Sequence, residues 1–370
     1  AAVGGKFKYR GGGAFWSNRI IFNWNKNVVE GNDVLDNSTR MLDMSRIGPI
    51  LTYEDELVRQ GPPVTAMLIQ NTNPAAVAPD THRVLRGFRR EDLFLCVHEQ
   101  FMTETAKMAD IVLPATTFLE HDDLYQAAGQ VHVQVHRAVI KPPGETRSNH
   151  WVLCQLAQRL GASHEGFEMT EWELVDRTLR DSGWPGAEEL LQKRWLDVQP
   201  SFDKAHFLKG FPTANGKFKF SADWSALGPL GHQLPSLPDY CPNIDLATPD
   251  KPFRMITSPA RNFLNSSFTE TPTSKKREGR PEVMIHPEAA SKLNILSGDR
   301  VRLGNEQGSV VLHALLFEGV QKDVIVVESV WPNAAFEEGI GINALISAEA
   351  GAPNGGAVFH DTAVWVSKIK

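Results

Sequence analysis

Short apolar runs separated by polar turns dominate the chain between residues 60 and 115. Residues 64–69 and 93–97 are almost entirely apolar, a pattern typical of parallel strands that are buried on both faces. A third run, 111–113, ends at a proline. Helical patterns over 82–88 and 103–109 separate the three runs, with Thr103 as a plausible N-cap of the second. This alternation predicts a parallel sheet wound with helices, whose strand carboxyl ends meet at one edge.

Longer helical patterns follow the predicted sheet. They cover 149–160, 170–179 and 186–195; Gly161 ends the first, and the second opens with a capping-box spacing of Thr and Glu. A proline-rich stretch over 227–252 then predicts a linker.

Beyond residue 252 the chain changes to several short strand patterns with turn residues between them. We predict strands over 253–257, 299–303, 308–314 and 324–327, with one short helix over 286–293. Such a succession favours a small β-barrel. The expected fold is therefore an α/β parallel-sheet, dinucleotide-binding-like domain followed by a small β-barrel domain. Its four segments are a connecting segment peripheral to the sheet (1–60), the α/β domain (61–226), the linker (227–252) and the barrel (253–370).

Composition narrows the function classes. The net charge of −6 leaves no basic surplus to neutralise phosphates, so we expect no nucleic-acid partner, and the run 275–277 (Lys-Lys-Arg) is interpreted as a solvated loop. No apolar stretch approaches the roughly 20 residues that span a bilayer, so we expect no membrane insertion. The three cysteines are far apart, which disfavours a metal or iron–sulfur site within this chain and suggests a reducing, cytoplasmic location. Because the sequence does not begin with Met, we expect its native start to lie outside it.

Polar residues follow the predicted strands at the edge where nucleotides bind in open α/β sheets. Asn71 and Asn73 come after the first strand, and His98 and Glu99 after the second. An Asn there can bond a nucleobase edge or simply favour a turn. A carboxylate there suits ribose hydroxyls or the N–H edge of guanine, with a surface loop as the alternative.

Two further candidates lie past the third strand. His121 could donate to a phosphate or ribose oxygen, although it lies in a Glu-His-Asp-Asp run that resembles a metal-ligand cluster. Because four adjacent residues rarely all point at one ion, we predict no metal site there. Asn149 opens a predicted helix, whose first N–H groups are unpaired; an N-cap role of Ser148 or Asn149 is equally compatible with this position.

These segments together resemble a known family. The motifs are Asn71-Thr-Asn-Pro74, the stretches 98–106 and 109–114, and Gly144-Glu-Thr-Arg-Ser-Asn149, and they resemble the third domain of molybdopterin-dependent oxidoreductases of the dimethyl-sulfoxide-reductase family. The stretches 258–268, 298–301 and 359–362 resemble that family's C-terminal pterin-dinucleotide-binding barrel. The resemblance extends over residues 64–366.

The resemblance implies a cofactor and its chemistry. In this family two molybdopterin guanine dinucleotides (bis-MGD) hold one molybdenum, which moves two electrons to or from a substrate, commonly with oxygen-atom transfer. It also implies that polar residues of the barrel loops approach the pterins and that Arg261 meets the diphosphate, whereas without the resemblance these would be interpreted as polar surface loops. The implied barrel residues are Thr257, Ser258, Arg261, Asn262, Asn265, Asn343, His360 and Asp361.

The chain departs from the family pattern in its metal ligands. Neither the residue that ligates molybdenum nor the cysteines of a 4Fe-4S domain are visible, and Cys96 lies inside a predicted strand. The chain therefore resembles the C-terminal half of such an enzyme, and we assign it no catalytic residue and no metal ligand. The implied partners are the remainder of the polypeptide, which would carry any 4Fe-4S cluster, and an electron-transfer subunit. We expect the fragment alone to be inactive.

Two other functions compete with this interpretation. The chain could be a non-catalytic assembly subunit that retains the fold, although its polar edge residues argue against degeneration. A nicotinamide-dependent dehydrogenase is disfavoured because no GxGxxG sequence follows a predicted strand.

Overall fold

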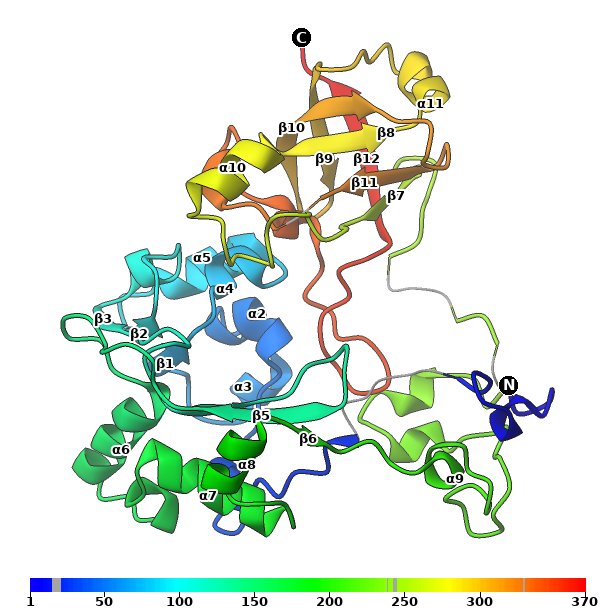
Figure 1. Ribbon diagram of the computed structural model, residues 1–370. Coiled ribbons are helices and arrows are strands. Elements are labelled where there is room, and N and C mark those ends of the chain that lie inside the picture. The colour runs from blue at the N-terminus through cyan, green and yellow to red at the C-terminus, as the bar shows by residue number, and fades with distance from the viewer. Residues whose placement is uncertain (15–20, 238, 242–244, 329) are drawn as a thin grey trace. The chain divides into compact units, whose positions relative to one another are not determined.

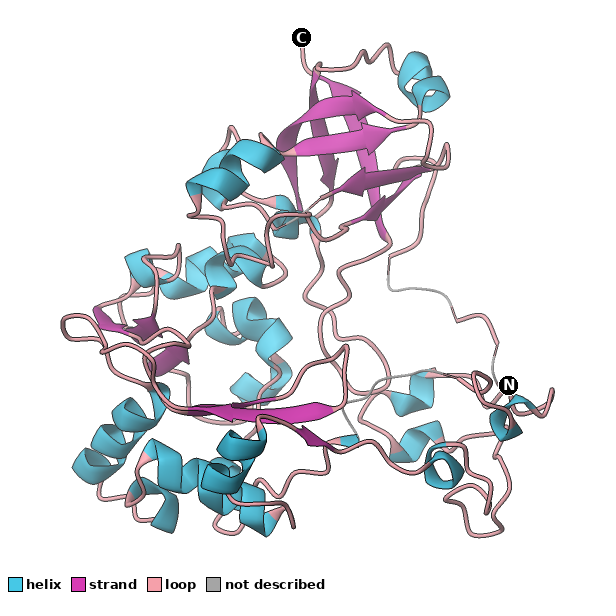
Figure 2. Ribbon diagram, viewed as in Figure 1, coloured by secondary structure: helices cyan, strands magenta, loops and turns pink. Residues whose placement is uncertain are grey.

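The fold was analysed in a computed structural model that describes residues 1–14, 21–237, 239–241, 245–328 and 330–370. Its internal contacts divide the chain into two units, 1–40 with 114–220 and 41–113 with 221–370. Figure 1 traces both units along the chain, and Figure 2 shows their helices and strands. This division differs from the four predicted segments. The first 60 residues are shared between the units, the predicted α/β domain (61–226) is divided at residue 114, and residues 61–113 fall in the same unit as the barrel. Each unit is described by itself.

The second unit contains the predicted wound sheet. Its strands are β1 (Ala66–Gln70), β2 (Phe94–Glu99) and β3 (Ile111–Pro114), in the order β1-β2-β3. The parallel pairing of β1 with β2 places Leu68 opposite Cys96 and Gln70 opposite His98, which confirms the predicted parallel sheet. The helices of this region are α2 (Ile47–Leu51), α3 (Glu56–Arg59), α4 (Pro74–Val77) and α5 (Thr81–Phe88).

The helix predicted over 103–109 is wrong in type and length. The chain forms only one 3-10 turn there, Ala106–Met108. The Thr103 hydroxyl nevertheless accepts a hydrogen bond from the Ala106 N–H at 3.2 Å, so its predicted capping contact is present. The Asp110 carboxylate accepts from the Leu95 N–H at 2.7 Å, which ties the residue before β3 to β2.

Residues 41–60 join this unit because α2 packs closely on α5. A Cβ atom added at Gly87 would lie 2.4 Å from the Leu51 Cβ, and one added at Gly48 would lie 2.9 Å from the Arg83 Cβ. Real Cβ atoms do not approach this closely, so the two glycines permit the helix contact. The sequence gives no hydrophobic period for such a short helix, and the prediction of a peripheral connecting segment missed it.

One face of the sheet does not match the prediction of strands buried on both sides. Ile69, Leu95 and Val97 are buried in the core that also contains Val84 and Phe88 of α5. In contrast, Leu68, Phe94 and Ile111 remain 36, 49 and 45% exposed. The strands therefore have one covered face and one face that retains apolar side chains at the surface.

The second part of this unit is a closed barrel, as predicted. Its six strands follow the order β10-β8-β11-β7-β12-β9. Two neighbouring pairs, β10 with β8 and β11 with β7, are parallel, and the other four neighbouring pairs are antiparallel. The strands are β7 (Phe253–Ile256), β8 (Glu282–Ile285), β9 (Arg300–Asn305), β10 (Gly308–Leu316), β11 (Val324–Val327) and β12 (Thr362–Lys368).

The barrel interior is filled by residues that alternate along each strand. Val283 and Ile285 of β8, and Val301 and Leu303 of β9, have no exposed surface. Helices α10 (Pro272–Glu278) and α11 (Pro287–Lys292) lie in the connections around β8. Helix α11 confirms the helix predicted at 286–293, whereas α10, β8 and β12 were not predicted.

The first unit pairs a small antiparallel sheet with helices. Strands β4 (Asp123–Tyr125), β5 (His132–His136) and β6 (Leu196–Asp197) lie in that order. Val133, Leu179 and Leu190 form the core between the sheet and the helices, with no exposed surface. The helices are α1 (Asn27–Glu30), α6 (Asn149–Leu160), α7 (Glu171–Asp181), α8 (Ala187–Lys193) and α9 (Phe202–Ala205).

Local capping chemistry sets the predicted helix ends in this unit. Ser148 caps the start of α6, and Gly161 ends it with a φ of 69°. Thr170 and Glu173 form a reciprocal capping box at the start of α7, as predicted. Helix α8 confirms the third predicted helix, two residues shorter at its C-terminal end.

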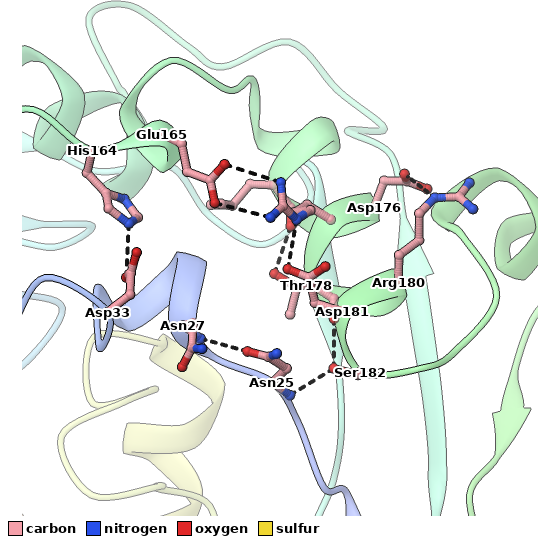
Figure 3. A network of polar contacts seen from close by, with 12 residues as sticks. Asn25, Asn27, Asp33, His164, Glu165, Asp176, Thr178, Arg180, Asp181 and Ser182 are labelled. Carbon is pink, nitrogen blue, oxygen red and sulfur yellow. Dashed lines mark hydrogen bonds and ion pairs between the residues drawn. The ribbon is translucent and has the colours of Figure 1, made fainter.

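Residues 25–33 are held by polar contacts to Ser182, directly after α7, and to His164, in the segment before α7 (Figure 3). The Asn25 N–H donates to the Ser182 hydroxyl at 2.9 Å, and that hydroxyl donates to the Thr178 carbonyl at 2.7 Å. His164 Nε2 lies 3.2 Å from an Asp33 carboxylate oxygen. These contacts explain why the first 40 residues belong to this unit.

The remaining regular structure consists of single 3-10 turns at Lys6–Lys8, Met44–Arg46, Glu165–Phe167, Trp224–Ala226, Gly231–Gln233, Asn333–Ala335 and Ile342–Leu345. Among the described helices, none combines the length and apolar composition that crossing a lipid bilayer requires.

Candidate functional site

A groove in the second unit runs along β1 and has a volume of about 620 Å³. One wall is formed by β1 and the residues that follow it, including Gln70, Thr72 and Pro74. Helix α2 contributes Ile47 and Ile50, and the segment leading to β12 contributes Gly356, Ala357 and Phe359. The groove therefore brings the loop at the carboxyl end of a sheet strand beside a loop of the barrel.

The lining of the groove is mainly apolar. Ser45, Gln70 and Thr72 are its polar side chains among the described lining residues, and none of those lining residues is charged. Thr72 is exposed, and Gln70 is half-buried. An apolar cleft with a few hydroxyl and amide groups suits a flat heterocycle with a polar edge better than a free diphosphate.

Asn71 and Asn73, both predicted to bind, have different surroundings. Asn71 is exposed and left-handed, with a φ of 49°, and its N–H donates to the His98 carbonyl at 2.9 Å. Asn73 is 3% exposed. Its amide donates to Glu104 at 2.8 Å and accepts from the Thr105 hydroxyl at 2.8 Å, so protein groups already engage both ends. The binding role of each stays a prediction, but the contacts of Asn73 make it a positioning residue for the loop.

His98 and Glu99 end β2 with opposite exposure. His98 is fully buried, and its Nδ1 lies 3.1 Å from the side-chain amide nitrogen of Gln70. Gln70 is a lining residue of the groove. Glu99 is half-buried, and its carboxylate accepts from the Gln100 N–H at 2.7 Å. His98 can thus orient Gln70, whereas Glu99 keeps a carboxylate at the surface of the sheet edge.

The barrel holds the loop after β1 in place through two buried asparagines. The Asn333 amide donates to the Ala75 carbonyl at 2.9 Å, and its carbonyl accepts from the Gly341 N–H at 2.8 Å. The Asn343 amide donates to the carbonyls of Ala76 and Val77 at 3.0 and 3.1 Å. Asn343 was predicted to approach a pterin; its amide nitrogen is engaged by α4 instead, and a contact with a ligand stays a prediction.

Glu104 completes this link between the sheet and the barrel. Besides Asn73, its carboxylate accepts from the Asn333 N–H at 3.1 Å. Neither Glu104 nor Asn333 was predicted as a site residue. Glu104 lies in the 98–106 motif, but the motif does not reveal its contacts, because its partners Asn73 and Asn333 are 31 and 229 positions away in the chain.

The residues predicted around β7 and β12 cluster next to the groove. The Thr257 hydroxyl donates to the carbonyl of Phe359, a groove residue, at 2.9 Å, and lies 3.4 Å from His360 Nδ1. Asp361 forms a two-point ion pair with Arg254 and has a φ of 72°. His360 is exposed. Thr257 therefore fixes the barrel wall of the groove, whereas His360 and Asp361 line a separate small cavity.

The loop after β7 carries the other predicted barrel residues. Arg261 and Asn265 are exposed, and Ser258 and Asn262 are half-buried. The N–H and the amide of Asn262 both donate to the Glu278 carboxylate. Burial, together with the negative charge of Glu278, raises the pKa of Glu328 above its usual range.

Two predicted residues belong to the first unit. His121 Nδ1 lies 2.8 Å from the Thr116 hydroxyl, and its Nε2 lies 3.6 Å from Asp123. Asn149 is exposed at the first position of α6. Among the described residues, no group of three or more His, Cys, Asp or Glu side chains is arranged to hold a metal ion.

A clasp between residues 43–45 and 355–356 forms another edge of the groove. The Asp43 carboxylate accepts from the Gly356 N–H at 3.0 Å and from the Ser45 hydroxyl at 2.7 Å. Burial would raise the pKa of Asp43, but these hydrogen bonds and the charge of Arg46 outweigh it and hold that pKa below its usual range. A Cβ atom added at Gly355 would lie 2.8 Å from this carboxylate, so glycine allows the close approach.

Two family models match the chain. One, described as molybdopterin oxidoreductase, matches residues 19–159, and one described as molydopterin dinucleotide binding domain matches residues 253–363. Each matched segment lines the groove. The lining residues at 42–79 fall in the first match, and Gly356, Ala357 and Phe359 fall in the second.

Curated proteins show the same similarity over longer stretches. Probable oxidoreductase YoaE of Bacillus subtilis (strain 168) is 32% identical over 374 aligned residues, which cover all of this chain and 53% of that protein. Trimethylamine-N-oxide reductase of Haemophilus influenzae (strain ATCC 51907 / DSM 11121 / KW20 / Rd) is 26% identical over 335 residues, 80% of this chain and 40% of that protein. The chain therefore spans about half the length or less of these relatives.

A solved structure has a similar fold. Acetylene hydratase from Pelobacter acetylenicus superimposes with a TM-score of 0.69 over 87% of this chain and 46% of its own, at 19% identity. At this identity the similarity concerns the fold alone.

Proposed function

We propose that this chain, which belongs to the molybdopterin oxidoreductase family, is the cofactor-holding C-terminal portion of a molybdenum oxidoreductase. The supporting observation is the shared groove. A segment matched as molybdopterin oxidoreductase and a segment matched as dinucleotide-binding domain line the same cleft within one unit. Such a cleft allows two segments that lie far apart in sequence to hold one ligand.

The residues of the groove fit one end of a molybdopterin guanine dinucleotide. Its apolar walls suit a flat pterin or guanine ring, and Gln70 and Thr72 offer amide and hydroxyl groups to the ring edge. The uncharged lining suits the diphosphate less well. For that part of the ligand we propose Arg261, an exposed guanidinium on the loop after β7, because planar guanidinium groups bind phosphate oxygens in pairs.

The other groups of the site would act by positioning. His98 orients Gln70, Asn73 and Glu104 fix the loop after β1, and Thr257 fixes Phe359. When bound, the molybdenum cofactor supplies the two-electron redox chemistry. Because we assign no ligand of the metal to the described residues, the rest of the longer protein would provide it. An electron-transfer subunit, a 4Fe-4S cluster and a cytoplasmic location remain predictions of the same proposal.

Cofactor analysis of the complete protein tests the proposal. The substitution Thr72→Leu removes a hydroxyl and adds bulk in the groove, and we expect it to weaken cofactor retention about tenfold. The measurement is molybdenum content by mass spectrometry and guanine nucleotide released by acid from the purified protein. Thr39→Leu, at an exposed position of the other unit, is the matched control and should leave both values unchanged.

Two outcomes separate the function from the site. If wild-type protein made with a molybdate supply contains neither molybdenum nor guanine nucleotide, the proposed function is wrong, and a non-catalytic assembly role replaces it. If wild type is loaded and a folded Thr72→Leu variant is loaded equally, the function stands but the groove is not the site. Arg261→Ala and Glu99→Ala then test those two residues in the same assay, with lowered occupancy expected for both.

A further inference from the structure

A cluster of phenylalanines in the first unit lies at the surface and contributes nothing to a buried core. Phe7 packs edge-on against Phe207 and Phe211, with ring centroids 5.7 and 5.4 Å apart. Phe211 contacts Phe218 at 5.3 Å, and Phe218 contacts Phe220 at 4.9 Å. None of these five rings is among the buried residues of the chain. The cluster joins the N-terminal residues to the segment after α9. Together with the Lys and Arg side chains of residues 1–14 and 204–222, we call it the basic aromatic surface.

Lysines alternate with these rings along both segments. Residues 6–10 read Lys-Phe-Lys-Tyr-Arg, and residues 217–220 read Lys-Phe-Lys-Phe. The stretches 1–14 and 204–222 together carry seven Lys and Arg and no Asp or Glu, in a chain whose net charge is −6. The acids adjacent to the second stretch are Asp203, which lies 3.6 Å from Lys209, and Asp223. Positive charge is therefore concentrated on an otherwise acidic protein.

Specific contacts hold the two segments together. His206 Nδ1 lies 2.5 Å from the Phe7 carbonyl, and the Arg10 guanidinium lies 5.5 Å from the centre of the Phe202 ring. At the same time Tyr9, Phe218 and Phe220 remain 55, 44 and 53% exposed. Leaving three large rings beside lysines in water has a cost in hydration free energy, which a partner that is apolar and anionic would remove.

We propose that the basic aromatic surface binds an anionic lipid surface peripherally. Aromatic side chains favour the boundary between headgroups and acyl chains, and each Lys or Arg near an anionic bilayer adds attraction. A protein partner is disfavoured because its interface would be depleted in lysine, whereas six of the seven cations here are lysines. Single-stranded nucleic acid is disfavoured because it stacks on open ring faces, and Phe207 and Phe211 already stack on each other at 4.9 Å.

Vesicle co-sedimentation of the complete protein tests this inference. We expect binding to equimolar phosphatidylcholine and phosphatidylglycerol vesicles, and little binding to phosphatidylcholine alone. The double substitution Lys217→Glu with Lys219→Glu should weaken this binding about thirty-fold or more, from the loss of two lysines near the surface. The double substitution Phe218→Ala with Phe220→Ala should weaken it about tenfold at unchanged charge.

A matched control separates this surface from net charge. Lys275→Glu with Lys276→Glu changes the charge equally at another exposed basic pair, on α10, and should leave vesicle binding within about twofold of wild type. Equal losses in the two lysine pairs would overturn the proposal, as would equal binding to neutral vesicles. Binding to poly-glutamate or to an oligo-dT strand without binding to anionic vesicles would also overturn it and identify the other partner class. Wild-type binding that persists from about 0.1 to about 0.5 M salt would contradict the role of the lysines, whether or not any variant folds.

Discussion

The barrel and the wound sheet belong to the same unit but differ in their strand edges: the barrel is closed, whereas the sheet is open. The barrel closes on itself, so each of its six strands has two neighbours and its inward side chains, such as Leu303, lose all contact with water. The sheet has three strands, and its apolar residues Leu68, Phe94 and Ile111 stay partly exposed. Closure supplies stability from within, whereas the open sheet leaves room along β1 for the groove. In this unit, then, the barrel provides rigidity and the sheet provides the cavity.

The largest effect should come from a core substitution in the barrel. Leu303→Ala leaves a cavity in a fully buried core and should lower the free energy of unfolding of the second unit by about 3 kcal/mol. Leu68→Ala makes the same chemical change on the open face of the sheet, where the side chain is 36% exposed, and should cost about 1 kcal/mol or less. Urea unfolding measured on both variants compares the two regions, and similar costs would mean that the sheet face is as well packed as the barrel.

An intermediate effect should follow from cutting the link between the two regions. Asn333→Ala removes the donor to the Ala75 carbonyl and the acceptor for the Gly341 N–H, both in buried surroundings, and should cost about 2 kcal/mol. Hydrogen exchange should rise in α4 and the loop after β1 more than in the barrel strands. Gln321→Ala, which removes an exposed side-chain amide in the same unit, is the control with little expected change. Unchanged exchange in α4 for Asn333→Ala would show that the sheet edge does not depend on the barrel.

The smallest effect concerns the Asp43 clasp and its pH dependence. Because folding lowers the pKa of Asp43, its contribution is present above the pKa of the unfolded chain and is lost as the pH falls through the lower, folded value. For this partly exposed group we expect about 0.5 kcal/mol. Asp43→Asn should therefore flatten the acid limb of the stability curve slightly and speed exchange at the Gly356 N–H near neutral pH. A steeper acid limb in the variant would contradict this assignment.

The sequence predicts those elements whose signals are local. Apolar runs identified β1 and β2, and caps at Ser148, Gly161 and Thr170 identified the ends of α6 and α7. Helix α2 and strand β8 are too short for a clear period, and their existence depends on packing: α2 on α5 through two glycines, and β8 between β10 and β11. The exposed face of the sheet was also missed, because an apolar run does not reveal which of its residues find a neighbour.

The binding roles of the predicted site residues stay predictions, but the structure shows what several of them contact. Asn73, His98 and Thr257 were chosen for residue type and position at strand ends, and each contacts a residue of the groove or of its supporting loops. Their partners are other protein groups, and those partners come from distant parts of the sequence. Spacing alone cannot distinguish an Asn that meets a ligand from one that meets a backbone carbonyl 258 positions away, as Asn333 does.

The link between α4 and the barrel also has a consequence for biosynthesis. The carbonyls of residues 75–77 find their partners at Asn333 and Asn343, and the cleft gains its last wall only with residues 356–359. On a ribosome, which releases the chain from its N-terminus, β1 and β2 would emerge long before these partners exist. The pocket can therefore form only after residues 333–359 have been synthesised, so a ligand that needs the complete pocket would bind after that segment has emerged.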